Sequence, residues 1–158
     1  MKRLFKIITG GQTGVDRAAL EWALANGVPH GGWCPKGRKA EDGIIPIQFQ
    51  LKETSSGNYS MRTRRNVRDS GGTVIFSEGL ELGGGTRETA DIAREIGKPL
   101  LHLVSSLEIK KAATQLDAFL KEHGIVVLNV AGPRASEEPD TGRFVQAVLS
   151  RALKPFIP

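Results

Sequence analysis

The sequence predicts an α/β protein in which a mostly parallel, doubly wound sheet lies between two layers of helices within a single domain. Three observations support this prediction. Short apolar runs alternate with helical patterns along the 158 residues, three helical patterns end at a glycine, and small polar residues follow the apolar runs. Alternating strands and helices give parallel strands joined by crossover helices, which form a three-layer structure. The length matches one domain of about 100–200 residues.

The apolar runs predict buried strands, because strands covered on both faces have continuous apolar sequence. They lie at residues 4–9, 73–76, 100–104 and 125–130, with a weaker candidate at 29–34. Helical patterns lie between and after them, at residues 15–25, 87–96, 107–123 and 140–153. Three of these patterns are followed by a glycine, which favours a helix end: Gly27, Gly97 and Gly124.

Residues 36–70 interrupt this alternation as an insertion. Gly43, Pro46 and the polar stretch 53–58 prevent any long element there, and a helix at about residues 59–69 closes the segment. Loops of this length are often functional, but surface excursions are also tolerated. The insertion is therefore either a lid over a binding site or a surface feature without a role in binding.

The charge balance favours anionic partners. The chain has 22 Lys and Arg against 17 Asp and Glu, which gives a net charge of +5. Small phosphate ligands and nucleic acid both fit this charge, but aromatic residues make up only 6% and do not interleave with the basic ones. Because single-strand binding uses aromatic stacking, nucleic acid is the less favoured partner.

Cysteine content and hydropathy indicate a cellular location. Cys34 is the only cysteine, so the chain has neither an intrachain disulfide nor a multi-cysteine metal site, which is typical of a reducing compartment. The apolar run near the start is too short for a signal peptide, and no run approaches the ~20 apolar residues of a membrane span. We expect a cytoplasmic protein that does not enter the membrane.

Two glycine loops follow predicted strands, where ligands bind in open α/β sheets. Glycine lets the backbone approach a phosphate, and the free amides of the next helix attract negative charge. We therefore expect the two loops to form one phosphate site, although glycine also serves ordinary strand-to-helix turns and Thr13 with Asp16 fits a capping box. The loops are Gly10-Gly11-Gln12-Thr13-Gly14 and Gly83-Gly84-Gly85-Thr86.

The better-known nucleotide motifs are missing. No GxxxxGK[ST] sequence occurs, which disfavours a P-loop NTPase. The dinucleotide pattern GxGxxG also fails, because Thr9 stands at its first glycine and the second predicted strand ends at Cys34 instead of an acidic residue. An NAD enzyme is therefore disfavoured as well.

Charged residues gather at two places. The turn after the second strand contains Lys36, Arg38 and Lys39, and the insertion helix contains Arg62, Arg64, Arg65 and Arg68. If this helix folds over the carboxyl edge of the sheet, its arginines could clamp a phosphate bidentately; otherwise they form a solvated face. Glu41 and Asp42 are either solvated or available for acid–base chemistry or a metal-phosphate. No Ser/His/Asp set is evident.

Five segments together resemble the molybdenum carrier family: ITGGQTGVDRAALEWAL, HGGWCPKGRKAEDG, YSMRTRRNVRDS, GGGTRET and LNVAGPR. This family is a circularly permuted, YpsA-like branch of the Rossmann-like proteins that include the lysine-decarboxylase-like and DprA-like groups. The resemblance covers nearly the whole chain. Its most specific part is GGQTGVDR followed by GWCPKGR and AEDG.

The resemblance implies a ligand site with three walls. The first consists of Gly10, Gly11, Gln12, Thr13, Gly14, Asp16 and Arg17, the second of Lys36, Gly37 and Arg38, and the third of Gly84, Gly85 and Thr86. Arg62 joins them if the insertion helix covers the site. The implied ligand is a nucleotide or the phosphate-bearing pterin of the molybdenum cofactor, and the resemblance also implies a homo-oligomer.

The sequence departs from related phosphoribohydrolases at one position. These enzymes have GGxGTxxE with a glutamate central to hydrolysis, whereas Thr89 occupies that position here and Glu88 precedes it. The sequence therefore favours a binding or carrier protein for a phosphate-bearing small molecule, with no protein ligand set for a metal. One alternative is a nucleotide or nucleoside-phosphate hydrolase using Glu88, Glu41, Asp42 or Asp16. The other is a DprA-like nucleic-acid-binding module.

Overall fold

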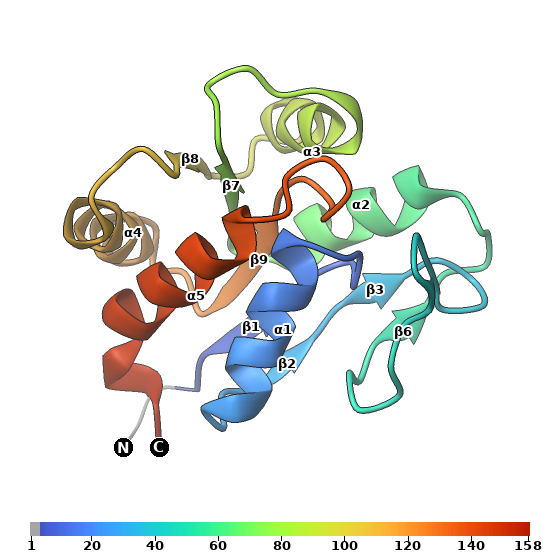
Figure 1. The fold of residues 1–158 in the computed structure, drawn as a ribbon, viewed down its shortest axis with the longest axis horizontal. Coiled ribbons are helices and arrows are strands. Elements are labelled where there is room, and N and C mark those ends of the chain that lie inside the picture. The colour runs from blue at the N-terminus through green and yellow to red at the C-terminus, as the bar shows by residue number, and fades with distance from the viewer. Residues whose placement is uncertain (1–3) are drawn as a thin grey trace.

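The computed structural model describes residues 4–158, which form a central five-stranded parallel sheet with helices on both faces (Figure 1). The strand order is β2-β1-β9-β7-β8, and every neighbouring pair is parallel. The strands are β1 (Lys6–Ile8), β2 (His30–Gly31), β7 (Gly72–Ser77), β8 (Leu100–Val104) and β9 (Val127–Ala131). The chain moves from β1 to one edge and from β7 to the other, as in a doubly wound sheet.

Five α-helices form the two outer layers. One layer contains α1 (Val15–Ala25), α4 (Ile109–His123) and α5 (Thr141–Ala152), with α5 packed between the other two. The opposite layer contains α2 (Tyr59–Asp69) and α3 (Gly84–Glu95), which pack against each other. A short 3-10 helix, η1 (Lys154–Phe156), follows α5. This arrangement confirms the predicted three-layer α/β fold.

The two faces of the sheet differ in polarity. Side chains alternate across a strand, and Leu128 and Val130 of β9 belong to the large core beneath α1, α4 and α5. Asn129 lies between them and projects to the opposite face, as does Thr73 of β7. Below α2 and α3 the apolar cluster contains only Val67, Ile92 and Ala93, with Leu100 beside it. This polar face leaves room for a binding site.

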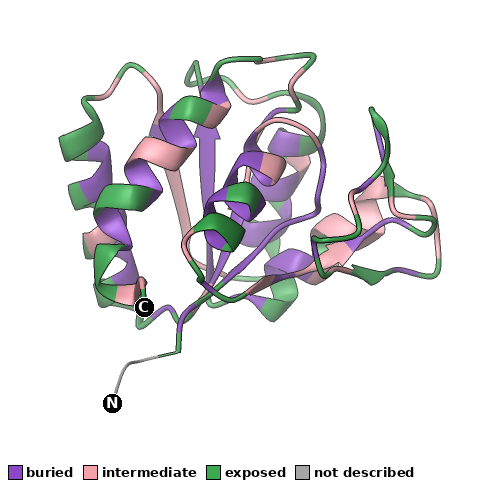
Figure 2. Cartoon of the chain, turned by 60° about the horizontal axis from the view of Figure 1, so that its bottom comes forward, coloured by how far each residue is buried: buried purple, intermediate pink, exposed green. Residues whose placement is uncertain are grey.

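Burial follows the predicted patterns in the inner strands (Figure 2), but the predicted buried strand at 100–104 forms the edge strand β8, in which only Leu103 is fully buried. The strands β7 and β9 are largely buried, and the helices bury one face each. In α4, for example, the buried residues recur at helical spacing: Ala112, Ala113, Leu116, Phe119 and Leu120. No helix within residues 4–158 combines the length and apolar character that crossing a membrane requires.

Most boundaries differ from the sequence-based predictions by one to three residues, and two larger differences affect the segments near the predicted site. The helix predicted to begin at residue 87 begins at Gly84, because the carbonyl of Gly83 already accepts the amide of Arg87 at 3.2 Å. Gly84, Gly85 and Thr86 therefore form the first turn of α3, not a loop before it. The strand predicted at 29–34 is split at Gly32 into β2 and β3 (Trp33–Cys34).

Residues 36–70 contain short strands and a complete helix. The strands β4 (Lys39–Ala40) and β5 (Gly43–Ile44) form an antiparallel hairpin, and β6 (Lys52–Glu53) pairs in parallel with β3. Ile45 and Phe49 pack with Leu20 of α1 in a small apolar cluster. The final element, α2, packs against α3 and belongs to the outer layer of the sheet.

Candidate functional site

A cavity of about 440 Å³ lies beyond the carboxyl ends of β1 and β9, between the N-terminal ends of α2 and α3. This volume lies within the range of about 300–1,000 Å³ usual for small-molecule sites. The position is where the sheet's connections diverge, which is the usual ligand position in an open α/β sheet. Its lining includes Gly10, Gln12, Asp16, Lys39, Tyr59, Arg62, Asn66, Gly85, Thr86, Glu88, Thr89, Asn129, Gly132, Arg134 and Glu137.

The N-terminal end of α3 opens into this cavity. Gly83 occupies the N-cap position and provides no side-chain hydrogen bond to the helix. Gly85 and Thr86 line the cavity, and Thr86 is only 7% exposed. First-turn amides have no partner within their own helix, so they attract an anion together with the helix dipole. The second glycine segment is therefore suited to a phosphate.

Three backbone amides of the first glycine loop donate to side chains within or directly beside the loop. The amide of Gly11 donates to Thr9 Oγ1 at 3.0 Å, that of Gln12 to Asp16 Oδ2 at 3.3 Å, and that of Thr13 to Gln12 Oε1 at 3.1 Å. Gly10, Gln12 and Asp16 line the cavity, whereas Gly11, Thr13, Gly14 and Arg17 do not. This geometry differs from the expectation of two glycine loops with free amides around one phosphate, because Asp16 already accepts from this loop.

Asp16 is a buried acid at the base of the cavity. Burial raises the pKa of its carboxyl group to about 6, against the opposing effects of Arg62, Arg17 and the amides of Gln12 and Gly10. Its side chain belongs to the first turn of α1 and is 7% exposed. The cavity therefore contains a carboxyl group that changes its charge close to neutral pH.

Arg62 provides a cation from α2. Its Nη1 donates to the carbonyl of Gly10 at 2.7 Å, and its guanidinium carbon lies 5.0 Å from the centroid of the Tyr59 ring. A Cβ atom at Gly10 would overlap the Arg62 side chain, so this approach requires glycine. Within residues 4–158 Arg62 forms no ion pair, which leaves its charge available to a ligand.

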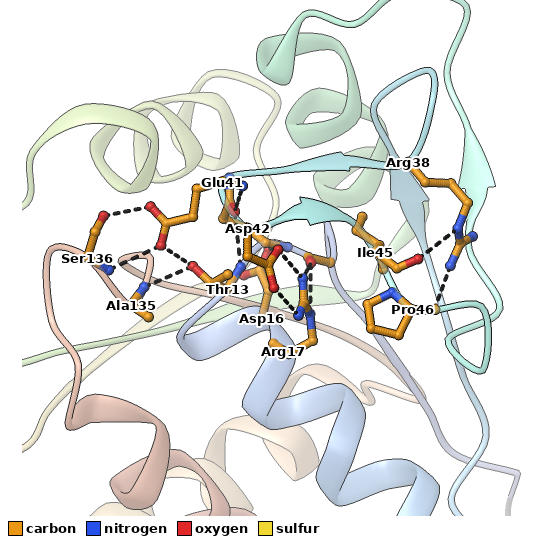
Figure 3. Close-up of polar contacts among 12 residues, drawn as sticks. Thr13, Asp16, Arg17, Arg38, Glu41, Asp42, Ile45, Pro46, Ala135 and Ser136 are labelled. Atoms are coloured by element: carbon orange, nitrogen blue, oxygen red, sulfur yellow. Dashed lines mark hydrogen bonds and ion pairs between the residues drawn. The ribbon is translucent and has the colours of Figure 1, made fainter.

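The predicted second wall lies elsewhere. Lys36, Gly37 and Arg38 do not line the cavity. Arg38 donates to the carbonyls of Ile45 at 3.2 Å, Pro46 at 2.9 Å and Phe49 at 2.8 Å, and Figure 3 shows it turned toward Ile45 and Pro46. The amide of Gly37 donates to Glu53 Oε1 at 2.6 Å, and Lys36 is exposed. Arg38 and Gly37 therefore form hydrogen bonds within the insertion and stabilise its structure.

Lys39 is the basic residue of this turn that lines the cavity. Its Nζ lies 4.7 Å from the centroid of the Tyr59 ring, so Tyr59 contacts both Lys39 and Arg62. Successive residues of a strand project to opposite sides, and Lys39 begins β4 directly after Arg38. Sequence reasoning placed Lys39 in the basic group but could not tell which neighbour faces the site.

Glu41 and Asp42 hold the β4–β5 hairpin against the rest of the protein (Figure 3). Glu41 accepts hydrogen bonds from Thr13 Oγ1 and from the amide and hydroxyl of Ser136, the last two at 3.1 and 2.6 Å. Asp42 pairs with Arg17 at 3.0 and 3.1 Å. Bonds from Ser136 and Thr13 lower the pKa of Glu41, and Arg17 lowers that of Asp42. Both acids are thus engaged as anions outside the cavity.

Several cavity residues were not predicted. Asn129 is 3% exposed and interrupts the apolar run of β9. A polar residue within an otherwise apolar strand was the sequence signal that could have identified it as a site residue. Tyr59 and Asn66 come from α2, whose position over the cavity depends on tertiary packing. Thr89 lies at the cavity, and its hydroxyl donates to the carbonyl of Gly85 at 2.9 Å. Residues 4–158 contain no group of three or more His, Cys, Asp or Glu side chains arranged to hold a metal.

Comparisons with known proteins agree with this architecture. A crystal structure described as "Putative molybdenum carrier protein" from Syntrophus aciditrophicus SB has 45% sequence identity and a TM-score of 0.92, and the match covers 96% of each chain. The comparison with curated proteins gives no match. The family model described as "Circularly permutated YpsA SLOG family" matches residues 7–153. Since this match spans nearly the whole sheet with its helices, the chain belongs to the circularly permutated YpsA SLOG family.

Proposed function

We propose that this protein binds or carries a phosphate-bearing small molecule, either a nucleotide or the pterin of the molybdenum cofactor. The observation that carries the proposal is the open N-terminal turn of α3 at a cavity of about 440 Å³. An anion placed there would accept from first-turn amides and gain from the helix dipole. Membership in the family and the likeness to a protein described as a molybdenum carrier support a ligand-binding role.

The charges of the cavity support an anionic ligand. Arg62 and Lys39 line it, and neither forms an ion pair within the described part of the chain. Arg134 lines it too, but its guanidinium lies 3.0 Å from Glu137. Two cations that form no ion pair within residues 4–158 therefore line the same cavity as the N-terminus of α3, where they can neutralise a phosphate. On α2, Arg64 pairs with Glu95 and Arg68 with Asp69, which reduces the charge available to nucleic acid on that helix.

A hydrolase is the second candidate because of one observation. Asp16 lines the cavity with a pKa raised to about 6 by burial, and a general acid or base works best with a pKa near the working pH. Thr89 favours the carrier instead. It stands where the related phosphoribohydrolases have their glutamate, and its hydroxyl donates to the carbonyl of Gly85 within the same helix. Release of free base or phosphate from nucleoside monophosphates would establish the hydrolase, and binding without release would establish the carrier.

Thermal unfolding with inorganic phosphate, AMP and molybdopterin tests the binding proposal. A ligand at a hundred times its Kd stabilises a protein by about 2.7 kcal/mol, which in a domain of this size raises Tm by roughly 5–10 °C. No shift with any of the three ligands would refute the proposal. Native mass spectrometry of freshly purified protein would identify a ligand retained from the cell.

Gly85→Asp should abolish the thermal shift, because its carboxylate would compete with phosphate at the start of α3. No atom lies within 4 Å of a Cβ atom built at Gly85, so the fold should tolerate the change. Gly79→Asp is the matched control, since its Cβ atom also meets nothing within 4 Å and it lies outside the cavity lining. Arg62→Gln should weaken binding, whereas Lys36→Gln should leave it unchanged.

A further inference from the structure

Trp33 lies outside the cavity lining and is fixed from two sides. It belongs to β3, which pairs with β6 so that Lys52 stands opposite it in register. Asn66 of α2 holds its backbone, because Oδ1 accepts from the Trp33 amide at 2.8 Å and Nδ2 donates to the carbonyl at 2.9 Å. The indole N–H donates to Asp69 Oδ2 at 2.8 Å. The half-buried ring is therefore held in one orientation at the surface.

Two cations lie over this ring. The guanidinium carbon of Arg65 is 4.7 Å from the ring centroid, and Nζ of Lys52 is 5.7 Å from it. The face of a tryptophan attracts cations within about 6 Å of its centroid. The ring thus restrains both long side chains, which reduces the conformational entropy that they would lose on binding a partner. We call Trp33, Lys52 and Arg65 the tryptophan–cation cluster.

The two positive charges of this cluster are not neutralised by ion pairs. Neither Lys52 nor Arg65 forms one within residues 4–158. Asp69 already accepts from Arg68 at 2.7 and 3.1 Å in addition to the indole N–H. Glu53 follows Lys52 on β6, and successive residues of a strand project to opposite faces. The cluster therefore presents an aromatic ring and two cations that can still pair with an anion.

The cluster suits an acidic protein segment better than a nucleic acid. Single-stranded nucleic acid binds by stacking its bases on aromatic faces, but cations already lie over this ring. Trp and Arg are enriched among the residues that dominate protein–protein interfaces. Carboxylates of a partner could accept charge-assisted hydrogen bonds from both cations without displacing them from the ring.

We propose that the tryptophan–cation cluster is a docking surface for a second protein, which it recognises through an acidic segment. This inference goes beyond the proposed function, because the cluster lies outside the cavity lining and requires no bound phosphate. The docked protein would still lie beside the ligand site, since Asn66 both holds the backbone of Trp33 and lines the cavity.

Nitrogen–proton NMR spectra recorded during titration with a decaglutamate peptide test the inference. The chain has two tryptophans, and the other, Trp22, is 4% exposed with its indole N–H bonded to Ser150 Oγ at 2.8 Å. The indole signal of Trp33 should shift while that of Trp22 stays in place. Added salt should reverse the shift, because it screens exposed charges. A Trp33 signal that does not respond to the peptide would overturn the proposal, as would a shift seen only with a thymidine oligonucleotide.

Lys52→Gln and Arg65→Gln test the two cations. Each should weaken peptide binding roughly threefold, as expected for one exposed ion pair, and the double variant should weaken it about tenfold. The matched control is Lys110→Gln with Lys111→Gln, which removes the same charge from exposed positions of α4 in the opposite layer. The control should bind like the wild type. If it weakens binding as much as the cluster variant does, the peptide responds only to net charge and the proposal is refuted.

Discussion

The raised pKa of Asp16 predicts a measurable dependence of stability on pH. Its carboxyl group has a pKa of about 6 in the folded chain, against 3.8 as its ordinary value. The folded state therefore binds this proton more tightly than the unfolded state does. Stability from this group is full below pH 3.8 and is lost as the pH rises toward 6. This direction is opposite to that of an ion-paired carboxylate.

The magnitude follows from the shift. Each tenfold change in proton affinity corresponds to about 1.4 kcal/mol, so the change from 3.8 to about 6 corresponds to about 3 kcal/mol of destabilisation above pH 6. Asp16→Asn removes the titrating group but keeps the shape of the side chain. The free energy of unfolding of the variant minus that of the wild type should therefore increase by about 2 kcal/mol between pH 4 and pH 7, because the carboxyl group of the unfolded chain is already partly ionised at pH 4.

Urea denaturation of both proteins at pH 4, 5, 6 and 7 measures this difference. Taking the difference removes the contributions of other titrating groups when they are independent of Asp16. The reasoning would be refuted if the difference stayed constant across the series, or if the wild type gained stability relative to the variant as the pH rose. Asp140→Asn serves as the control, because it makes the same substitution at an exposed position outside the cavity.

Two further predictions concern the insertion. Arg38→Met should lower the free energy of unfolding by about 3 kcal/mol in urea denaturation, because three carbonyl groups lose a charged donor; a change as small as that of the exposed Lys36→Met would contradict this role. Glu41→Gln should speed hydrogen exchange in residues 39–44 at pH 7, because it removes an anion that accepts from Ser136 and Thr13. The pKa of Glu41 is lowered, so its contribution exists above its ordinary value of 4.5 and is lost as the pH falls through the lowered pKa. The two proteins should therefore exchange alike in strong acid, and a difference that persists there would contradict the assignment.

The binding proposal and the hydrolase alternative depend on the same cavity. A carrier would need only the phosphate subsite at α3 and the cations that line the same cavity. A hydrolase would need Asp16 or Glu88 to act on a bound substrate, and both line the cavity. Turnover measured with nucleoside monophosphates separates these functions, because only a hydrolase releases free base or phosphate, and Asp16→Asn would abolish that release if Asp16 were its general acid or base.

Much of the fold could be predicted because local sequence specifies its elements. The helices α1 and α2 span the predicted residues 15–25 and 59–69, and β8 spans 100–104. The apolar spacing that forms these elements also determines which face they bury, so the layers follow. The sequence did not indicate that the strand predicted at 29–34 is split at Gly32. The split arises because β3 leaves the main sheet and pairs with β6, which lies far along the chain.

The site was predictable only in part. Two glycine segments after strands pointed to the carboxyl edge, and Gly10, Gln12, Asp16, Gly85 and Thr86 do line the cavity there. The sequence could not show which loop has free amides for a ligand. The side chains of Gln12 and Asp16 accept hydrogen bonds from amides of the first loop, and the spacing of these residues does not specify such contacts. The presence of glycine shows where backbone could approach a ligand, but not whether its amides are free.

The sequence alone determined the three-layer fold and the edge of the sheet at which the cavity lies, because periodicity and turn residues act over a few neighbouring positions. The family was indicated by the resemblance of its motifs. Tertiary structure decided which charged residues meet there. Lys39 and Arg62 line the cavity while Arg38 binds carbonyl groups of the insertion. It also raised the pKa of Asp16 by burying it. Burial and long-range pairing depend on the whole chain, so neither can be obtained from the local pattern of residues.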